Sequence, residues 1–130
     1  MASGYNSHSY TAAEAIAPFR VVYVSGANEV SVNDNDTDFP VGVSGGGTSR
    51  FDDSDTNSGD PIELQETGVK RIQASAAISA GAVVAVTTGG KVVTAPAAAA
   101  GNKAVGVAIT AASDADDLIL VHWWPHARNA

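Results

Sequence analysis

Residues 21–32 read Val-Val-Tyr-Val-Ser-Gly-Ala-Asn-Glu-Val-Ser-Val, and residues 83–94 read Val-Val-Ala-Val-Thr-Thr-Gly-Gly-Lys-Val-Val-Thr. In each stretch, two runs rich in β-branched residues flank a short turn of small and polar residues, which is the pattern of a β-hairpin. The second stretch follows the first by 62 residues. The sequence therefore predicts one hairpin unit that occurs twice.

The elements around the two hairpins are repeated in the same order. An Ala-Ile pair comes first, a Val-Gly-Val follows the hairpin, and an acidic turn with an apolar strand comes last. These elements lie at 15–16, 41–43 and 59–64 in the first copy and at 77–78, 105–107 and 116–121 in the second. Because repeated short strands and turns are typical of all-β architectures, we expect a mainly β fold. It is a small β-barrel or β-sandwich-like domain with two pseudo-repeated hairpin units over about 15–66 and 77–122.

The expected secondary structure is about ten short strands and almost no helix. The strands are predicted at 19–25, 29–32, 39–44, 61–66, 69–74, 83–86, 91–94, 105–109 and 118–123. The alternation over 69–74 leaves open which of its two faces is buried. The four alanines at 97–100 are too few for an independent helix, so we expect a loop or a single helical turn there.

Composition and charge argue against several classes of protein. The chain has 130 residues, a net charge of −7 and no cysteine, which predicts one compact domain without disulfides or thiolate metal sites. An anionic chain without a basic cluster is repelled by phosphate backbones, so nucleic acid is not an expected partner. The N-terminus lacks the pattern of a signal peptide, and no apolar run is long enough to span a membrane. We expect a soluble protein made in the cytoplasm.

Residues 1–14 are small and polar and show no helical or strand period. Such a segment is typical of a disordered terminus, and equally of an arm that becomes ordered on a partner. Tyrosine is enriched at binding hot spots, which makes Tyr5 and Tyr10 the candidate anchors. We expect an extended N-terminal arm over 1–14 and a single β-rich domain over 15–130.

Candidate metal sites are weak. In the acidic runs 34–38 and 53–57, carboxylate or amide side chains occur at alternate positions. Neither run is followed by the glutamate of an EF-hand loop. Solvated turns are the expected structure, with calcium binding as the alternative. His122 and His126 have the spacing of a helical zinc site, but the preceding run is strand-like, so shared ligation is not expected.

Candidate catalytic groups are equally weak. The sequence has neither a phosphate-binding glycine loop nor a nucleophile elbow. We therefore expect no cofactor and no enzymatic activity. The alternative is a small hydrolase that uses loop aspartates such as Asp34, Asp36 and Asp55.

The pair Trp123-Trp124 ends the last predicted strand. Neighbours in a strand point to opposite faces, so one tryptophan can be in the core while the other is exposed or at an interface. Because aromatic residues are over-represented in subunit contacts, we expect self-association to involve Trp123 and Trp124. Capping of the barrel end is the alternative.

The second copy contains four motifs in a fixed order. They are Ala-Ile-Ser-Ala-Gly-Ala-Val-Val at 77–84, Gly-Lys-Val-Val at 90–93, Ala-Val-Gly-Val-Ala at 104–108 and Asp-Leu-Ile-Leu-Val-His at 117–122. In this order and composition the chain resembles a capsid decoration protein of tailed bacteriophages, also called a cement or head-stabilising protein. The resemblance is close over about 70–122 and looser over 15–66.

The resemblance implies a structural protein of the virion on the outer capsid surface. It implies the major capsid protein as partner, a homotrimer as the assembly, and stabilisation of the expanded head. It also implies that the N-terminal arm contacts the capsid, and by position and composition Ser3, Tyr5, Asn6 and Tyr10 fit this role. The alternative is a carbohydrate- or surface-binding β-module that stacks sugars on Tyr23, Trp123 or Trp124.

Overall fold

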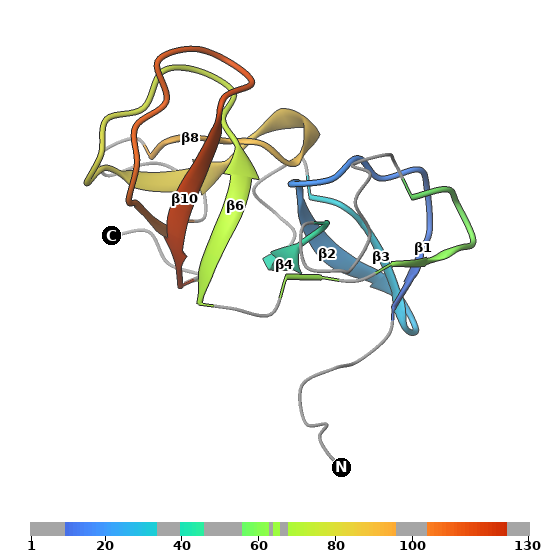
Figure 1. The fold of residues 1–130 in the computed structure, drawn as a ribbon. Helices are drawn as coiled ribbons and strands as arrows, with labels where there is room; N and C mark the ends of the chain where they lie inside the picture. The colour runs from blue at the N-terminus through green and yellow to red at the C-terminus, as the bar shows by residue number, and fades with distance from the viewer. Residues whose placement is uncertain are drawn as a thin grey trace.

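A computed structural model describes residues 10–33, 40–45, 56–62, 64–65, 68–95 and 104–124. Within these ranges the chain forms ten strands and a short 3-10 helix, arranged as two sheets side by side (Figure 1). The elements are β1 (Tyr10–Ala12), β2 (Val21–Gly26), β3 (Glu29–Val32), β4 (Pro40–Val43), β5 (Pro61–Ile62), β6 (Val69–Gln73), β7 (Val83–Val86), η1 (Thr88–Gly90), β8 (Val92–Thr94), β9 (Ala104–Ala108) and β10 (Leu118–Trp123).

Each half of the chain builds one sheet. Lobe 1 is the sheet with strand order β4-β2-β3-β1-β5, and lobe 2 is the sheet with order β6-β10-β9-β7-β8. In each sheet, an isolated bridge joins the two edge strands or residues that closely follow them. In lobe 1 the bridge joins Ser44 to Leu64, and in lobe 2 it joins Ala74 to Val92. Both sheets therefore curl towards a small five-stranded barrel with the same circular strand order.

The internal repeat is confirmed at the level of single hydrogen bonds. The Ala13 amide donates to the Val30 carbonyl, and 62 residues later the Ser75 amide donates to the Val92 carbonyl, both at 2.8–2.9 Å. Isolated antiparallel bridges join Ile16 to Thr56 in lobe 1 and Ile78 to Ala112 in lobe 2. The repeated Ala-Ile motif thus occupies the same place in both lobes.

The structure extends the repeat further towards the N-terminus than the sequence predicts. Strand β1 begins at Tyr10, inside the segment 1–14 that is expected to be an arm. It is only three residues long and is held by distant partners: the Ala12 amide donates to the Asp60 carbonyl, and the Gly59 amide donates to the Ala12 carbonyl. A strand fixed by tertiary hydrogen bonds leaves no local pattern to detect. Its counterpart in lobe 2 is β6.

Most predicted strands agree with the structure to within two residues, and the exceptions are local. The strand expected at 61–66 is reduced to β5, followed by the bridge residue Leu64. The turn expected at 87–90 contains η1. The alanine run 97–100 lies outside the described residues.

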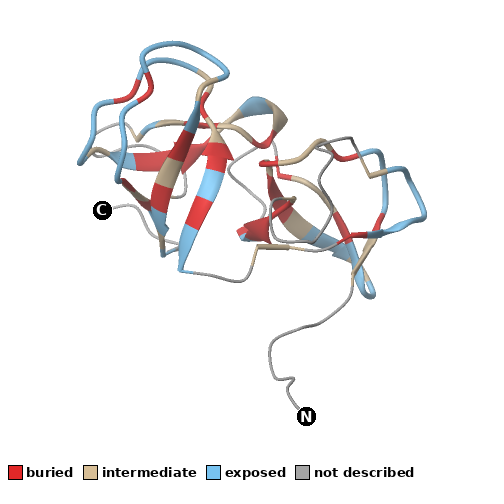
Figure 2. Ribbon diagram, viewed as in Figure 1, coloured by how far each residue is buried: buried red, intermediate tan, exposed pale blue. Residues whose placement is uncertain are grey.

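The structure also determines which face of β6 is buried. Lys70 and Ile72 point inward, at 6% and 0% exposure, whereas Val69 is 40% exposed. Figure 2 shows this alternation along β6. The Lys70 ammonium remains satisfied because it donates to the Gln65 carbonyl. A lysine stem can line an apolar surface while its charged end reaches a polar group, which is why alternation alone does not decide the facing.

The apolar core of lobe 2 extends across the junction to two residues of lobe 1. Val22 belongs to the cluster inside lobe 1, with Val30 and Ile62. Its neighbour Val21, paired across β2 and β4 with Val43, belongs to the cluster that fills lobe 2. Neighbouring residues of a strand face opposite sides, so β2 supplies apolar side chains to both cores.

Polar contacts at the same junction join the lobes. The Arg20 guanidinium donates from Nε to Gln73 Oε1 at 3.0 Å and from a terminal nitrogen to the Gly89 carbonyl at 3.1 Å. Gly90 has φ +76, and a Cβ there would lie 2.9 Å from the Val21 carbonyl oxygen. The Gly-Gly of the second hairpin is therefore required where η1 packs on the start of β2.

The two Val-Gly-Val motifs are equivalent in sequence but differ in how tightly their glycines are packed. A Cβ added at Gly106 would overlap the backbone carbonyl of His122 on the neighbouring strand β10. A Cβ added at Gly42 would meet the Leu64 Cδ1 methyl at 2.8 Å, the far end of a flexible side chain. Only the contact at Gly106 requires the backbone to move.

We therefore expect unequal effects from the same substitution in the two motifs. Gly106→Ala lowers the free energy of unfolding by about 3 kcal/mol, because overpacking against backbone strains the sheet. Gly42→Ala lowers it by about 1 kcal/mol or less, since Leu64 can change rotamer. Urea denaturation of both variants measures the difference, and equal losses would contradict this account of the packing.

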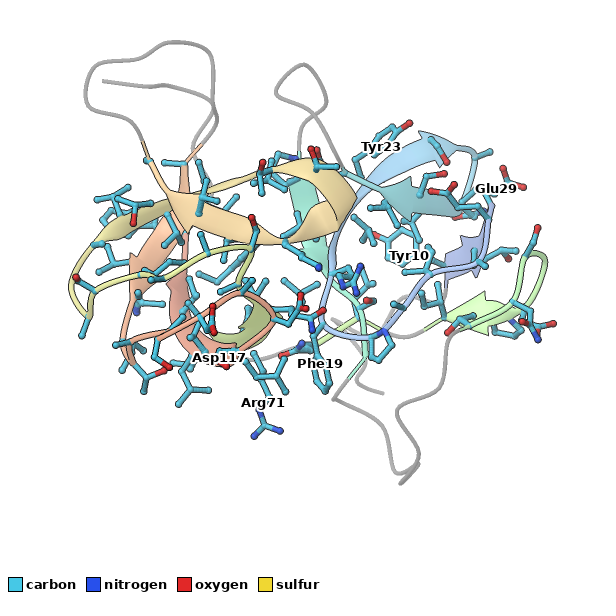
Figure 3. The ribbon with its side chains drawn as sticks, turned by 90° about the horizontal axis from the view of Figure 1, so that it is seen from above. Tyr10, Phe19, Tyr23, Glu29, Arg71 and Asp117 are labelled. Carbon is cyan, nitrogen blue, oxygen red and sulfur yellow. The ribbon has the colours of Figure 1, made fainter. Side chains whose placement is uncertain are left out.

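A second prediction concerns the lobe junction. Arg20→Ala removes a charged donor from two half-buried acceptors and lowers the free energy of unfolding by about 2 kcal/mol. Arg71→Ala is the matched control, because the Arg71 side chain extends away from the lobes (Figure 3), and its effect stays within about 0.5 kcal/mol. Thermal and urea unfolding of the two variants compare them; a loss at Arg71 equal to that at Arg20 would refute the role of Arg20.

Candidate functional surfaces

The predicted capsid-binding residues divide into two groups. Ser3, Tyr5 and Asn6 lie outside the described residues. Tyr10 lies in β1, opposite Ile62 of β5, and its half-buried side chain packs against the core of lobe 1 (Figure 3). The segment that precedes the sheet is therefore joined to the interior of lobe 1 at Tyr10.

Strand β1 is held from both sides. It pairs in parallel with β3 and antiparallel with β5. The Thr11 amide donates to the Asn28 carbonyl at 2.8 Å, and the Ala12 amide donates to the Asp60 carbonyl at 2.9 Å. A force applied to residues before Tyr10 is consequently carried by hydrogen bonds to two neighbouring segments.

The two tryptophans lie on opposite sides of the end of β10, as the alternation of a strand predicts. Trp123 packs against the core of lobe 2, and the Lys70 ammonium lies 6.0 Å from the centroid of its ring. Trp124 is 50% exposed. Its ring meets the His122 ring edge to face, with centroids 5.8 Å apart and an interplanar angle of 86°.

Lobe 2 carries apolar side chains on its outer face as well as inside. Directly opposed residues of neighbouring strands share a face of the sheet, and the register places Val69, His122, Val107 and Val83 in one row across β6, β10, β9 and β7. Leu120 and Leu118 follow along β10, opposite Arg71 and Gln73. The outer face of lobe 2 is defined here by six apolar residues: Val69, Val83, Val107, Leu118, Leu120 and Trp124.

The sequence analysis named Trp123 and Trp124 for self-association; only Trp124 lies on this face, and the other five residues were not predicted. The signal was present in β10, where Leu118, Ile119, Leu120 and Val121 are apolar without alternation. A strand that is apolar on both faces is typical of a sheet covered on both sides. The valines opposite β10 could be assigned to the face only when the register was known.

The predicted sugar-stacking residues are not brought together. Tyr23 lies half-buried on β2 of lobe 1, whereas Trp123 and Trp124 lie at the end of β10 in lobe 2. Trp123 is packed against the core. A stacking platform needs exposed aromatic faces, and among these three residues only Trp124 is exposed.

The acidic residues of lobe 2 stabilise a turn. One carboxylate oxygen of Asp117 accepts hydrogen bonds from the Ser113 amide and hydroxyl and from the Asp114 amide, at 2.9–3.2 Å. Asp116 has φ +72, and its carboxylate accepts a 2.6 Å hydrogen bond from the Lys91 ammonium. Aspartates commonly form turns through such local bonds.

Within the described ranges, no group of three or more His, Asp or Glu side chains is arranged to hold a metal ion. The acidic runs 34–38 and 53–55 and His126 lie outside these ranges. Across the described segments, no helix is both long and apolar enough to cross a membrane.

The charge of the protein is divided unevenly between its halves. Residues 1–66 contain two basic and eleven acidic residues, a net charge of −9, and residues 67–130 contain five basic and three acidic residues, a net charge of +2. The three acidic residues of the second half all lie in the turn at 114–117. The strands of lobe 2 therefore carry no carboxylate.

Comparison with known families decides the class of the protein. The family of phage cement proteins matches residues 2–123, nearly the whole chain. This chain belongs to the phage cement protein family. Capsid decoration in the virion, which the order of motifs implied, is therefore its role. No curated protein sequence matches the chain.

A solved structure shares the fold of this cement protein. The N base of the head fiber protein gp8.5 of bacteriophage phi29 superposes with a TM-score of 0.66 at 17% sequence identity, over 92% of this chain and 93% of that one. At this identity the likeness establishes the fold. It confirms the mainly β architecture over both lobes.

The acidic turn gives a prediction about pH. The hydrogen bond and charge of Lys91 lower the pKa of Asp116 below its ordinary value. Lys91→Met therefore raises the pKa of Asp116 towards the ordinary value of about 3.9, as measured by NMR titration of its carboxyl carbon. Because the lowered pKa belongs to the folded state, the ion pair contributes above the unfolded-state pKa and is lost as pH falls through the folded-state pKa. An unchanged titration in Lys91→Met would contradict this assignment.

Proposed function

We propose that this cement protein binds the outer surface of a phage head as a homotrimer and holds neighbouring major capsid proteins together. Its role is structural and involves no catalysis. The observation that carries the proposal is the extent of the family match, which starts at residue 2, eight residues before β1. The N-terminal segment therefore belongs to the pattern that defines cement proteins, along with the two lobes.

In this proposal residues before β1 form the arm that contacts the major capsid protein, with Ser3, Tyr5 and Asn6 in the contact. Tyr10 is the base of the arm, where it enters lobe 1. Strand addition to a neighbouring sheet makes main-chain hydrogen bonds and demands little of the side chains. A short polar arm of ordinary composition is compatible with that kind of contact.

A trimer would make a weak arm contact effective. A head presents many identical sites in fixed geometry, and three linked arms bind several of them with a high effective concentration. Release then requires all arms to detach within the same interval. Clamping neighbouring subunits in this way would oppose their separation when packaged DNA presses on the shell.

The test is cosedimentation of the protein with expanded, undecorated heads. We expect the full chain to saturate at a fixed ratio to the major capsid protein, and a variant lacking residues 2–8 to lose binding at least tenfold. The deletion stops before Tyr10, so β1 and the unfolding transition remain intact. A second deletion, of residues 2–12, removes β1 and should also destabilise lobe 1.

Two results would overturn the arm mechanism. Equal affinity of the 2–8 deletion and the full chain would place the capsid contact elsewhere on the lobes. Failure of the full chain to bind heads, combined with binding to glycans on an array, would favour a carbohydrate-binding module instead.

A further inference from the structure

We propose that copies of this chain associate through the outer face of lobe 2, with these faces turned towards a common axis. The inference deepens the proposed trimer by assigning its contact surface. Its place in the head rests on the proposed function, but the association itself is a property of the protein in solution.

The first argument is the chemistry of the face. Val69, Val83, Leu118 and Trp124 are 40%, 47%, 46% and 50% exposed, and they are distributed across β6, β7 and β10. Single exposed apolar side chains are normal on soluble proteins, whereas large exposed apolar patches mark interaction sites. The opposite side of the same strands already fills the core of lobe 2, so this second apolar face is not needed to form that core.

The second argument concerns which lobe supplies the contact between copies of the proposed trimer. Contact through lobe 1 would bring together halves of the chain that carry −9 each, whereas lobe 2 belongs to the half that carries +2. Like charges in close contact are unfavourable. Copies that meet through lobe 2 bring together halves that carry only +2 each, and the strands of lobe 2 carry no carboxylate.

The third argument concerns the centre of the face. His122 lies between Val69 and Val107 in the cross-strand row, and Trp124 covers its ring from the end of β10. Arg71 lies one row away on β6, next to Leu120. A large aromatic on the same face as aliphatic side chains, with polar groups beside it, is the composition of a subunit contact.

The register also predicts how neighbouring copies meet. Val69 lies at the β6 side of the face and Val83 at the β7 side. In a ring of copies, the β6 side of one copy contacts the β7 side of the next. A charge at either side should therefore weaken every contact in the ring.

The test compares two valines with the same exposure. Val83 on the outer face and Val24 on β2 of lobe 1 are both 47% exposed, so Val83→Lys and Val24→Lys make the same change on and off the proposed contact. We expect sedimentation equilibrium to give the wild type a mass that is a multiple of 13.1 kDa. Val83→Lys should dissociate at concentrations at least tenfold higher than the wild type, and Val24→Lys should match the wild type.

Salt and a second variant complete the design. Apolar contacts persist in concentrated salt, whereas contacts between lobe 2 and an acidic lobe 1 weaken as charges are screened. We expect association to persist in 1 M NaCl, where the Debye length is about 3 Å and charges farther apart are screened. Should Val83→Lys lower the unfolding midpoint, Trp124→Glu replaces it as the charged variant on the face.

Three outcomes would overturn the inference: a monomeric wild type at every concentration, a charged variant on the face that associates like the wild type, or association that salt abolishes. The cosedimentation assay with heads is independent of all three. A monomer that still decorates heads would refute this contact surface and leave the cement role standing. An oligomer that does not bind heads would refute the proposed binding to heads and leave this contact surface standing.

Discussion

The architecture depends on the opposite facing of two neighbouring valines at the start of β2. Val22 fills the interior of lobe 1, and Val21 points into the core of lobe 2 together with Val43. Each buried valine contributes about 1.5–3 kcal/mol relative to an exposed one. A strand that is buried on both faces connects two small cores, neither of which is large.

The two lobes have the same circular strand order, but the backbone hydrogen bonds beside their closing strands differ. In lobe 1 the Thr11 amide donates to the Asn28 carbonyl, within the same lobe. The equivalent amide in lobe 2, that of Gln73, donates instead to the Phe19 carbonyl of lobe 1. Residues 19 and 20 of lobe 1 thus bind where β6 and β8 meet, and Arg20 supplies further hydrogen bonds there. This difference between the two lobes creates hydrogen bonds that join them to each other.

The sequence predicted the features that depend on local patterns. Both hairpins, the 62-residue spacing and the strand β10 follow from β-branched runs and turn residues, and the structure places them as expected. The sequence also implied the cement protein family from the order of its motifs. The hairpins and β10 share one property, which is that each is encoded within about twelve consecutive residues.

Features that depend on distant partners could not be predicted. Strand β1 is defined by hydrogen bonds to residues near 28–30 and 60. Phe19 has φ +64 where its repeat equivalent is Gly81, a conformation that costs a bulky residue about 1 kcal/mol or more. Burial of the Phe19 ring offsets this cost, and only the folded structure shows it. The outer face of lobe 2 likewise required the register of four strands.

The position of β10 has a consequence for synthesis. This strand is the last described element, yet it lies between β6 and β9 and contributes Leu118, Leu120 and Trp124 to the outer face. Lobe 2 therefore cannot close while the chain is still emerging from the ribosome before residue 123. A prematurely terminated chain keeps its acidic first half and lacks part of the outer face of lobe 2, which we propose as the subunit contact. The order of strands thus restricts the proposed subunit contact to chains that have been completed through β10.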